Sequence, residues 1–183
     1  MGLVLRLDRP VSGVLALART SKAAARISAQ CRQGTPVKKY MALTEGRTAD
    51  GGMCRDYLVK EENRTVRVVA SGHPGARLAE LEWRSVAFHR DITLLDIQIK
   101  TGRAHQIRAQ MAARGMPIIG DMRYGSRTSF DGRNLALHCY CLEIEHPVRK
   151  VHMSWTVGPP AAWQGFFEQD TAHIIEAASS ALQ

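Results

Sequence analysis

The first part of the chain alternates an apolar run with a helical pattern. Residues 14–18 are apolar and follow a turn that contains proline and glycine, which predicts a buried strand leaving that turn. Thr20 or Ser21 then caps a helix that is rich in alanine and runs through Ala29. Gly34 ends this helix, because glycine readily adopts the left-handed backbone at a helix end.

Strand patterns dominate the middle of the chain. Residues 37–43 predict a strand, and residues 78–83 and 92–99 predict the two strands of a hairpin with a polar turn between them. Residues 104–114 contain good helix formers and end at Gly115, which predicts a helix entered from a polar loop.

The last third continues the same mixture. Residues 135–144 and 151–157 predict strands, while residues 161–167 and 171–182 predict helices. Helices that interrupt the strands without strict alternation favour the α+β class, with a mixed, mostly antiparallel sheet and flanking helices. We expect residues 1–183 to form a single domain.

The charge balance points to a polyanionic partner. The chain has 25 Lys and Arg against 17 Asp and Glu, a formal net charge of +8. Such an excess is typical of proteins that bind a phosphate backbone, although a basic, solvated surface gives the same count. No apolar run reaches membrane-spanning length, and Arg6 interrupts any secretory leader, so we expect a cytoplasmic protein without membrane association.

The four cysteines show no CxxC pair, so we expect free, mostly buried thiols in a reducing compartment. Cys139 and Cys141 would lie on one face of a strand beside His138. Without visible further ligands, these three residues predict no metal site.

Asp8 is the first candidate for chemistry, because it lies between Arg6 and Arg9 at the junction of a strand and a turn. Neighbouring cations favour the ionised carboxylate, which can then serve as a nucleophile or a base. For the tripeptide taken alone, a surface Asp that pairs with Arg is the better explanation.

Two further segments carry candidate binding residues. Tyr40 follows two lysines, an arrangement that can stack on an unpaired base and hold phosphates, but it also suits an ordinary edge strand. Residues 101–108 place several cations at a helix start, where phosphate binds readily. Arg108 can instead point inward to a buried acid, and His105 alone would be a structural residue.

Taken together and in order, these segments resemble the RluA-type pseudouridine synthases, a family of RNA-modifying enzymes. The resemblance covers about four fifths of the chain and is specific. The matching motifs are Arg6-Leu7-Asp8-Arg9 with Ser12-Gly13, Lys39-Tyr40-Met41-Ala42, Thr101-Gly102-Arg103-Ala104-His105-Gln106-Ile107-Arg108, Pro117-Ile118-Ile119-Gly120-Asp121, Tyr124-Gly125, Ala136-Leu137-His138 and His146-Pro147.

The resemblance implies a function and a set of site residues. It implies that Asp8 is the catalytic aspartate, that Tyr40 stacks on the target base and helps to remove its C5 proton, and that Arg108 pairs with Asp8. Further contacts to the RNA or the flipped base would come from Arg6, Arg9, Lys39, Arg103, His105, Gln106 and Leu137. The implied reaction converts uridine to pseudouridine in ribosomal or transfer RNA, without a cofactor or a metal, and leaves the oligomeric state open.

The chain departs from the family pattern in two places. Leu5 stands where the family usually has His, so a polar contact near the site is expected to be lost. In the family, an N-terminal strand with a Lys-Pro-x-Gly segment usually precedes this motif, and some relatives have an accessory RNA-binding domain; we expect this chain to lack both. An exposed sheet edge would then favour association or lower the stability of the fold. Alternatively, the chain is a fragment of a longer product.

Two other functions stay open at this point. One is a catalytically impaired RNA-binding or ribosome-assembly module with the same fold, which would bind RNA in a salt-dependent manner without modifying it. The other is a hydrolase of sugar or nucleotide bonds. That reaction usually needs a second carboxylate, for which Asp121 is the only candidate, although a turn residue explains Asp121 better.

Overall fold

The structure is a computed structural model that describes residues 2–180. The α-helices are α1 (Ser21–Gln33), α2 (Gln106–Ala112) and α3 (Glu168–Ser180), and the 3₁₀ helices are η1 (Met122–Tyr124) and η2 (Ala161–Trp163). The strands are β1 (Gly2–Leu3), β2 (Ser12–Gly13), β3 (Leu17–Ala18), β4 (Val37–Glu45), β5 (Gly51–Lys60), β6 (Val66–Val69), β7 (Arg77–His89), β8 (Ile92–Ile99), β9 (Leu137–Glu145) and β10 (His152–Thr156).

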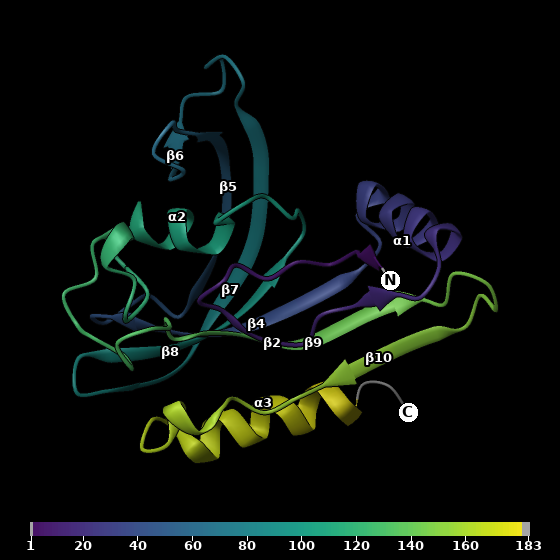
Figure 1. The fold of residues 1–183 in the computed structure, drawn as a ribbon. Helices are drawn as coiled ribbons and strands as arrows, with labels where there is room; N and C mark the ends of the chain where they lie inside the picture. The colour runs from purple at the N-terminus through teal and green to yellow at the C-terminus, as the bar shows by residue number, and fades with distance from the viewer. Residues whose placement is uncertain (1, 181–183) are drawn as a thin grey trace.

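Most strands belong to one sheet with the order β10-β9-β4-β8-β7-β5-β6, in which each neighbouring pair is antiparallel. The short strand β2 adds to it in parallel with β9. The sheet is therefore mixed and mostly antiparallel, and the predicted α+β class is confirmed. Figure 1 shows α1 and α2 above the sheet and α3 below it.

The core is centred on the middle strands, whose side chains are buried on both faces. Leu43, Leu95 and Tyr140 are among the largest fully buried side chains. On the side of α3, Ile174 and Trp163 join the same apolar cluster. Burial of each such side chain stabilises the fold by roughly 1.5–3 kcal/mol, so this part of the sheet is a rigid platform.

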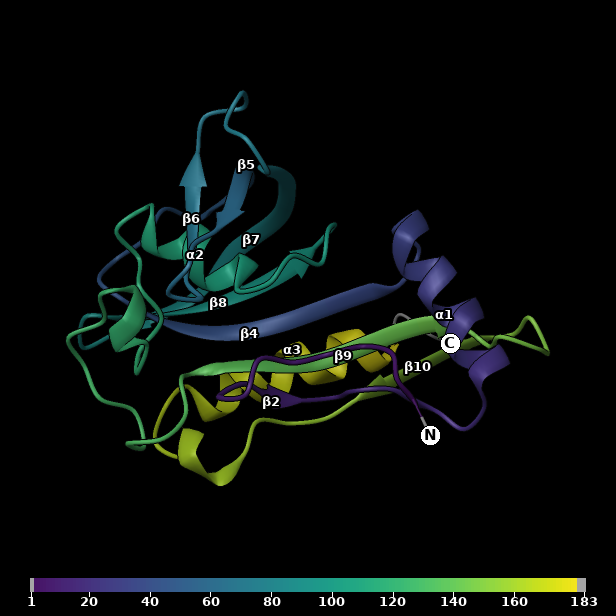
Figure 2. The same ribbon diagram turned by 45° about the horizontal axis from the view of Figure 1, so that its top comes forward.

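The N-terminal segment crosses this platform and turns back into β2, as Figures 1 and 2 show. Leu5 is buried and packs against Ile27 of α1 and Leu142 and Ile144 of β9, so it fixes the segment through apolar contacts. Gly13 has a φ of 126°, and a Cβ atom there would collide with the Cys139 carbonyl. This close approach to β9 is open to glycine alone and brings the turn before β2 close to the sheet.

Local signals placed one helix and one hairpin correctly. Thr20 caps α1 by accepting a hydrogen bond from Ala23 N at 3.1 Å, and Gly34 ends the helix with a φ of 73°. The predicted hairpin is formed by β7 and β8, and the two turn residues Arg90 and Asp91 have positive φ angles. Such a left-handed pair matches the twist of the adjoining strands.

Two predictions of elements were wrong. Residues 14–18 do not form a buried strand: only Leu17 and Ala18 are extended, and the Leu15 and Leu17 side chains are about half exposed. The helix expected over residues 161–167 is a short 3₁₀ turn, because the positive φ of Gly165 interrupts it.

The other helices are shifted. Helix α2 begins only at Gln106, because His105 is left-handed. Helix α3 begins at Glu168, and the part of the predicted helix beyond Ser180 lies outside the described residues. Strands β5 and β6 had no prediction, because their apolar positions are interrupted by glycines and charges.

All four cysteines are free thiols; Cys54, Cys139 and Cys141 are buried and Cys31 is half-buried. Burial raises the pKa of both Cys54 and Cys139 to about 11, which keeps these thiols protonated at neutral pH. Within residues 2–180, no group of three or more His, Cys, Asp or Glu side chains is placed to hold a metal ion. No described helix is long and apolar enough to cross a membrane.

Candidate active site

Asp8 lies at the turn where the N-terminal segment reverses towards β2. Its carbonyl accepts a hydrogen bond from Val11 N at 2.9 Å, which closes the turn. The side chain is 28% exposed, and its Oδ2 atom lies 3.3 Å from Arg108 Nη1 and 3.9 Å from His105 Nε2. The carboxylate is therefore held by positive and polar groups while one side stays open.

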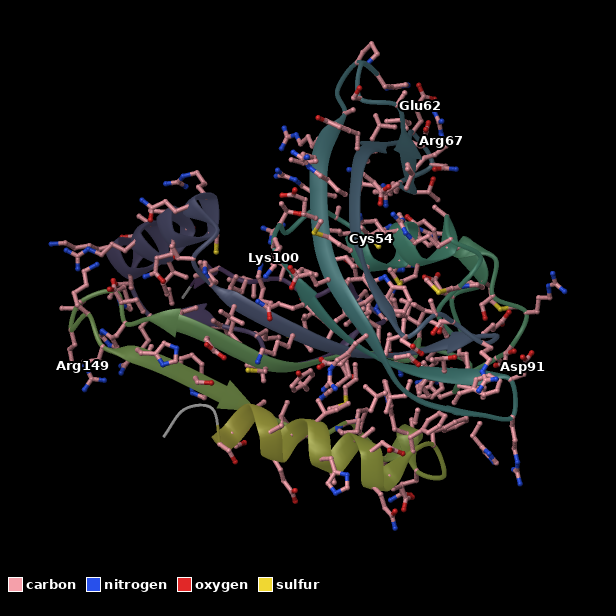
Figure 3. The ribbon with its side chains drawn as sticks, turned by 180° about the vertical axis from the view of Figure 1, so that it is seen from behind. Cys54, Glu62, Arg67, Asp91, Lys100 and Arg149 are labelled. Atoms are coloured by element: carbon pink, nitrogen blue, oxygen red, sulfur yellow. The ribbon has the colours of Figure 1, made fainter. Side chains whose placement is uncertain are left out.

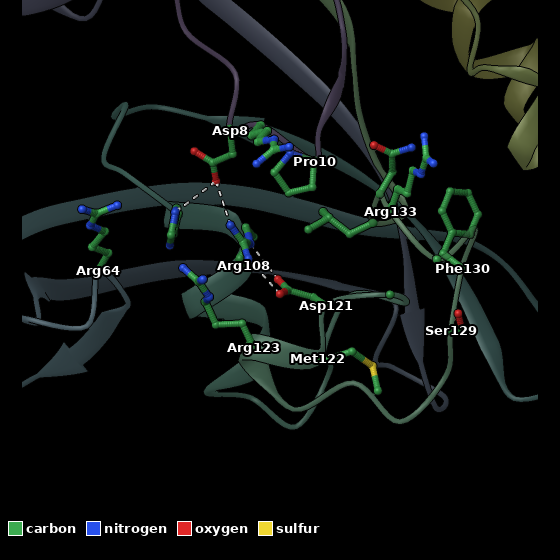
Figure 4. A pocket seen from close by; sticks show the side chains of 16 residues that line it. Asp8, Pro10, Arg64, Arg108, Asp121, Met122, Arg123, Ser129, Phe130 and Arg133 are labelled. Atoms are coloured by element: carbon green, nitrogen blue, oxygen red, sulfur yellow. Dashed lines mark hydrogen bonds and ion pairs between the residues drawn. The ribbon is translucent and has the colours of Figure 1, made fainter.

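Arg108 is the buried charge that faces Asp8. It is 6% exposed, and it donates two hydrogen bonds to Asp121, from Nε at 2.7 Å and from Nη2 at 2.8 Å. Its guanidinium carbon also lies 4.9 Å from the centre of the Tyr124 ring, a cation–π contact. Because Asp121 holds one edge of the guanidinium, Nη1 is left to point at Asp8, as Figure 4 shows.

The charge of Arg108 is secured by its partners. Burial lowers the pKa of Arg108, but the hydrogen bonds and charges of Asp121 and Asp8 outweigh it, and the net pKa is raised above its ordinary value. Asp121 itself is 2% exposed. The sequence interpretation of Asp121 as a turn residue is thus incomplete, since its carboxylate forms a buried ion pair.

His105 closes the other side of Asp8. Its Nδ1 lies 2.9 Å from the Tyr124 hydroxyl, and that same hydroxyl accepts a hydrogen bond from Val66 N at 2.8 Å. Tyr124 therefore joins α2 to the β5–β6 hairpin. The backbone of His105 is left-handed, with a φ of 49°, and its side chain forms no hydrogen bond that caps the helix.

The environment of His105 favours its neutral form. Burial lowers its pKa most strongly, and the nearby cations Arg108 and Arg123 add to this effect. The carboxylates of Asp8 and Asp121 oppose it without reversing the direction. We therefore expect an uncharged imidazole beside Asp8 at neutral pH.

A cavity of about 790 Å³ opens beside Asp8, and Tyr40 forms part of its wall; we call it the Tyr40 cavity. Tyr40 and Leu137 are 7% and 4% exposed and come from the neighbouring strands β4 and β9. The pKa of Tyr40 is raised well above 10, first by burial and then by Cys139 and Asp8. Tyr40 is accordingly a neutral phenol next to the Asp8 carboxylate.

Most of the residues predicted to bind RNA lie on this cavity. Asp8, Tyr40 and Arg108 line it together with Arg6, Arg103, His105, Gln106 and Leu137. Arg9 lines an adjoining cavity instead, and Lys39 lines neither. The lysine on the cavity side of β4 is Lys38, which the alternation of side chains along a strand would have indicated.

Gln106 serves the loop that enters α2. Its Oε1 accepts hydrogen bonds from Thr101 Oγ1 at 2.8 Å and from Arg103 N at 3.0 Å, and its Nε2 donates to Glu80 O at 3.0 Å. The amide thus has partners at both ends within the chain. These contacts shape the loop, and the RNA contact that the resemblance implies for Gln106 stays a prediction.

His138 supports the site from β9 and gives a prediction for pH dependence. Its Nε2 lies 3.0 Å from Val157 O, which can only accept, so Nε2 carries the proton and Nδ1 accepts from Ser12 Oγ at 2.8 Å. Burial lowers the pKa of His138 from its ordinary value of 6.5, although the bond to Val157 opposes the shift. The folded protein therefore binds this proton less tightly than the unfolded chain does.

We expect the free energy of unfolding to fall as the pH drops below 6.5, because protons then favour the unfolded state. The lowered pKa of His105 acts in the same direction. Urea unfolding across this range tests it, and His138→Asn should make the pH dependence weaker than in the wild type. If the free energy of unfolding changed equally with pH in the wild type and in His138→Asn, the role of His138 would be contradicted.

Comparison with known proteins places the chain in a family. Residues 1–113 match the family described as "RNA pseudouridylate synthase". Because this match covers more than half of the chain, the protein belongs to that family, and the resemblance seen in the sequence is confirmed.

Several curated relatives are similar to nearly the whole chain. The ribosomal large subunit pseudouridine synthase D of Salmonella typhimurium is 31% identical over 96% of the chain, and that of Pasteurella multocida is 27% identical over 100%. The uncharacterized RNA pseudouridine synthase YlyB of Bacillus subtilis is 30% identical over 96%. The chain spans only 55%, 57% and 55% of these relatives, in that order.

Two solved structures share the fold. Human RNA pseudouridylate synthase domain containing 4 superposes with a TM-score of 0.73 at 21% identity, over 96% of this chain and 76% of that one. Human RNA pseudouridylate synthase domain containing 1 gives a TM-score of 0.77 at 18% identity, over 98% and 80%. At these identities the likeness concerns the fold alone.

Proposed function

We propose that this protein converts uridine to pseudouridine in RNA, with Asp8 as the essential carboxylate. The observation that carries the proposal is the convergence of Asp8, Tyr40 and Arg108 on one cavity in a chain of this family. These residues come from three separate segments, so their meeting is a property of the fold.

The reaction requires only rearrangement of the nucleotide. The bond between N1 and C1′ breaks, the uracil rotates, and C5 bonds to C1′. C5 then loses its proton and N1 gains one, so the atoms and electrons of the nucleotide balance without an oxidant or a reductant. Asp8 either adds to C1′ or takes a proton from C2′, and both routes need an accessible carboxylate.

The surroundings of Asp8 suit this task. Arg108 stabilises the carboxylate and is itself fixed by Asp121, so the site needs little reorganisation during the reaction. Asp8 lies in the wall of a cavity, where a nucleotide that is stacked inside folded RNA cannot reach it. The target nucleotide must therefore leave its stack. The Tyr40 cavity then receives the flipped base between Tyr40 and Leu137, while Arg6 at the rim holds the nucleotide.

Ribosomal RNA is the substrate that we propose first. Similar proteins are named ribosomal large subunit pseudouridine synthase D, and the net charge of +8 suits a large polyanion. Transfer RNA is the other class that the sequence left open.

Tyr40 is expected to act mainly through its ring. Its raised pKa keeps the hydroxyl protonated at neutral pH, so hardly any phenolate is present to take the C5 proton, and stacking should outweigh proton removal. Tyr40→Phe should keep activity within roughly tenfold, whereas Tyr40→Ala should lose about 1–3 kcal/mol of binding to the flipped base. Single-turnover kinetics would measure both variants. A loss in Tyr40→Phe as large as in Tyr40→Ala would instead assign the proton transfer to the hydroxyl.

The direct test incubates the purified protein with ribosomal RNA and, separately, with transfer RNA, each transcribed without modifications. Nucleoside mass spectrometry then measures pseudouridine. Formation at a defined uridine of ribosomal RNA supports the proposal. Salt-dependent binding without pseudouridine would support the RNA-binding module instead, and release of free uracil would support a hydrolase.

A further inference from the structure

Asp8 also lines a second cavity, of which Tyr40 is not part. Its volume is about 640 Å³, and it shares Asp8, His105 and Arg108 with the Tyr40 cavity. The candidate site thus has two cavities that meet at the reactive carboxylate. The isomerisation of one nucleotide uses the first cavity and gives no role to the second.

Arginines dominate the wall of this second cavity, which we call the arginine cavity. Four of them come from four separate segments: Arg9 from the N-terminal segment, Arg64 from the β5–β6 turn, Arg123 from η1, and Arg133 from the loop before β9. With Arg108, the wall holds five arginines against the two aspartates Asp8 and Asp121. In Figure 4, Arg123 rises from below towards the Asp8–Arg108 pair, Arg64 stands to the left of the pair, and Arg133 lies on the opposite side, near Phe130.

The charges of these four arginines are not used inside the protein. Throughout residues 2–180, no carboxylate forms an ion pair with Arg9, Arg64, Arg123 or Arg133. Arg108, by contrast, is already bound to both aspartates of the cavity. Four uncompensated guanidinium groups around one concave surface repel one another, so an anionic ligand would relieve that repulsion.

Two of the four arginines stand on stiff loops. In the turn that carries Arg64, Asn63 Oδ1 accepts hydrogen bonds from Thr65 N at 2.9 Å and Thr65 Oγ1 at 2.6 Å. The adjoining Val66 is tied to the Tyr124 hydroxyl. This turn is therefore fixed to the rest of the site by the same residue that contacts His105.

The loop of Arg133 is fixed by a neighbouring aspartate. Asp131 Oδ1 accepts from Arg133 N at 2.9 Å and from Asn134 N at 2.6 Å, and Asp131 Oδ2 accepts from Asn134 Nδ2 at 2.6 Å. The Asp131 carboxylate is thus engaged with its own loop, which holds the backbone at Arg133 beside the cavity. Arginines on such preformed loops lose little conformational entropy when they bind phosphate.

We propose that the arginine cavity binds the backbone phosphates of the nucleotides on one side of the target uridine. The guanidinium group matches phosphate oxygens in a bidentate manner, which suits a backbone better than a neutral base. The strand would cross Asp8, with the target base in the Tyr40 cavity and the adjoining phosphates among the arginines. The position of the uridine in this inference rests on the proposed function; the phosphate site does not.

Salt-dependent binding of the complete chain tests the inference. The probes are fluorescent oligouridylates of about 4 and about 12 nucleotides, with uridine monophosphate as a competitor. Each phosphate contact to a single strand contributes about −0.7 to the slope of log affinity against log salt concentration. The triple variant Arg64→Ala, Arg123→Ala, Arg133→Ala should therefore have a slope about two units shallower.

Between about 50 and about 200 mM salt, this difference means that the wild-type affinity falls roughly twentyfold more than that of the triple variant. The corresponding Arg→Lys variant keeps the charges and should restore most of the slope. Arg149→Ala is the matched control, since Arg149 is an exposed arginine in the β9–β10 turn (Figure 3). Circular dichroism would confirm that the variants are folded.

Three results would overturn the inference. The first is an unchanged salt slope in the triple variant. The second is an equal loss of affinity in Arg149→Ala and Arg123→Ala, which would indicate a diffuse surface effect. The third is uridine monophosphate that competes as strongly as the longer oligonucleotide, which would assign the cavity to a free nucleotide. If the triple variant has the expected shallower salt slope while the wild type forms no pseudouridine, the phosphate site stands and the proposed function fails. If pseudouridine forms while the slopes stay unchanged, the proposed function stands and the phosphate site fails.

Discussion

Replacing Asp8 with Asn is expected to abolish pseudouridine formation while RNA binding stays near the wild-type level. The side chain keeps its shape but loses the charge and the nucleophilic oxygen on which both proposed routes depend. Removal of a nucleophile commonly costs a factor of roughly 10⁴ or more in turnover. Asp8 is 28% exposed and makes one hydrogen bond to Arg108, so its replacement should disturb the fold little.

Single-turnover assays with excess enzyme would measure this loss, and a filter-binding assay would measure RNA affinity in parallel. Asp50→Asn is the matched control, because Asp50 is exposed and lies outside both cavities. Turnover in Asp8→Asn within tenfold of the wild type would refute the assignment. Equal losses of binding and turnover would give Asp8 a role in recognition only.

Replacing Asp121 with Ala should have the largest effect on stability. Asp121 and Arg108 are 2% and 6% exposed, and removal of one partner leaves the other charge buried without its main partner. Breaking a buried pair in this way costs about 3–5 kcal/mol. Urea unfolding would measure the change, and Asp50→Ala is the exposed control. Activity should fall as well, since Arg108 would no longer be held towards Asp8.

A double variant separates these two consequences. In Arg108→Met with Asp121→Ala, no buried charge is left alone, so much of the lost stability should return. Activity should not return, because Asp8 still lacks its guanidinium partner. A double variant as unstable as the sum of the single variants would show that the pair matters through packing. Recovered activity would remove Arg108 from the site.

The fold could be predicted where the signals were local. The ends of α1 depend on Thr20 and Gly34, whose effects extend over only a few residues. The prediction of a buried strand over residues 14–18 was wrong because burial depends on neighbours in space. The Leu15 and Leu17 side chains are about half exposed to solvent. Strands β5 and β6 gave no clear pattern, since their stability comes from pairing with β7 and from contacts with α2.

The candidate site could be predicted only through the order of its motifs. Asp8 and Arg108 lie 100 residues apart, and no local rule connects them. The pairing of Arg108 with Asp121, and the bridging position of Tyr124, depend on how the chain folds around α2. A single sequence also gave no sign that Arg64 would come close to Asp8, because the hairpin that carries it was not recognised.

Pseudouridine mapping in the ribosomal RNA of cells that lack this gene tests the central claim most directly. We predict that one or a few uridines lose the modification, and that the wild-type gene restores it whereas the Asp8→Asn gene does not. An unchanged map in the deletion strain, or full restoration by the Asp8→Asn gene, would contradict the claim.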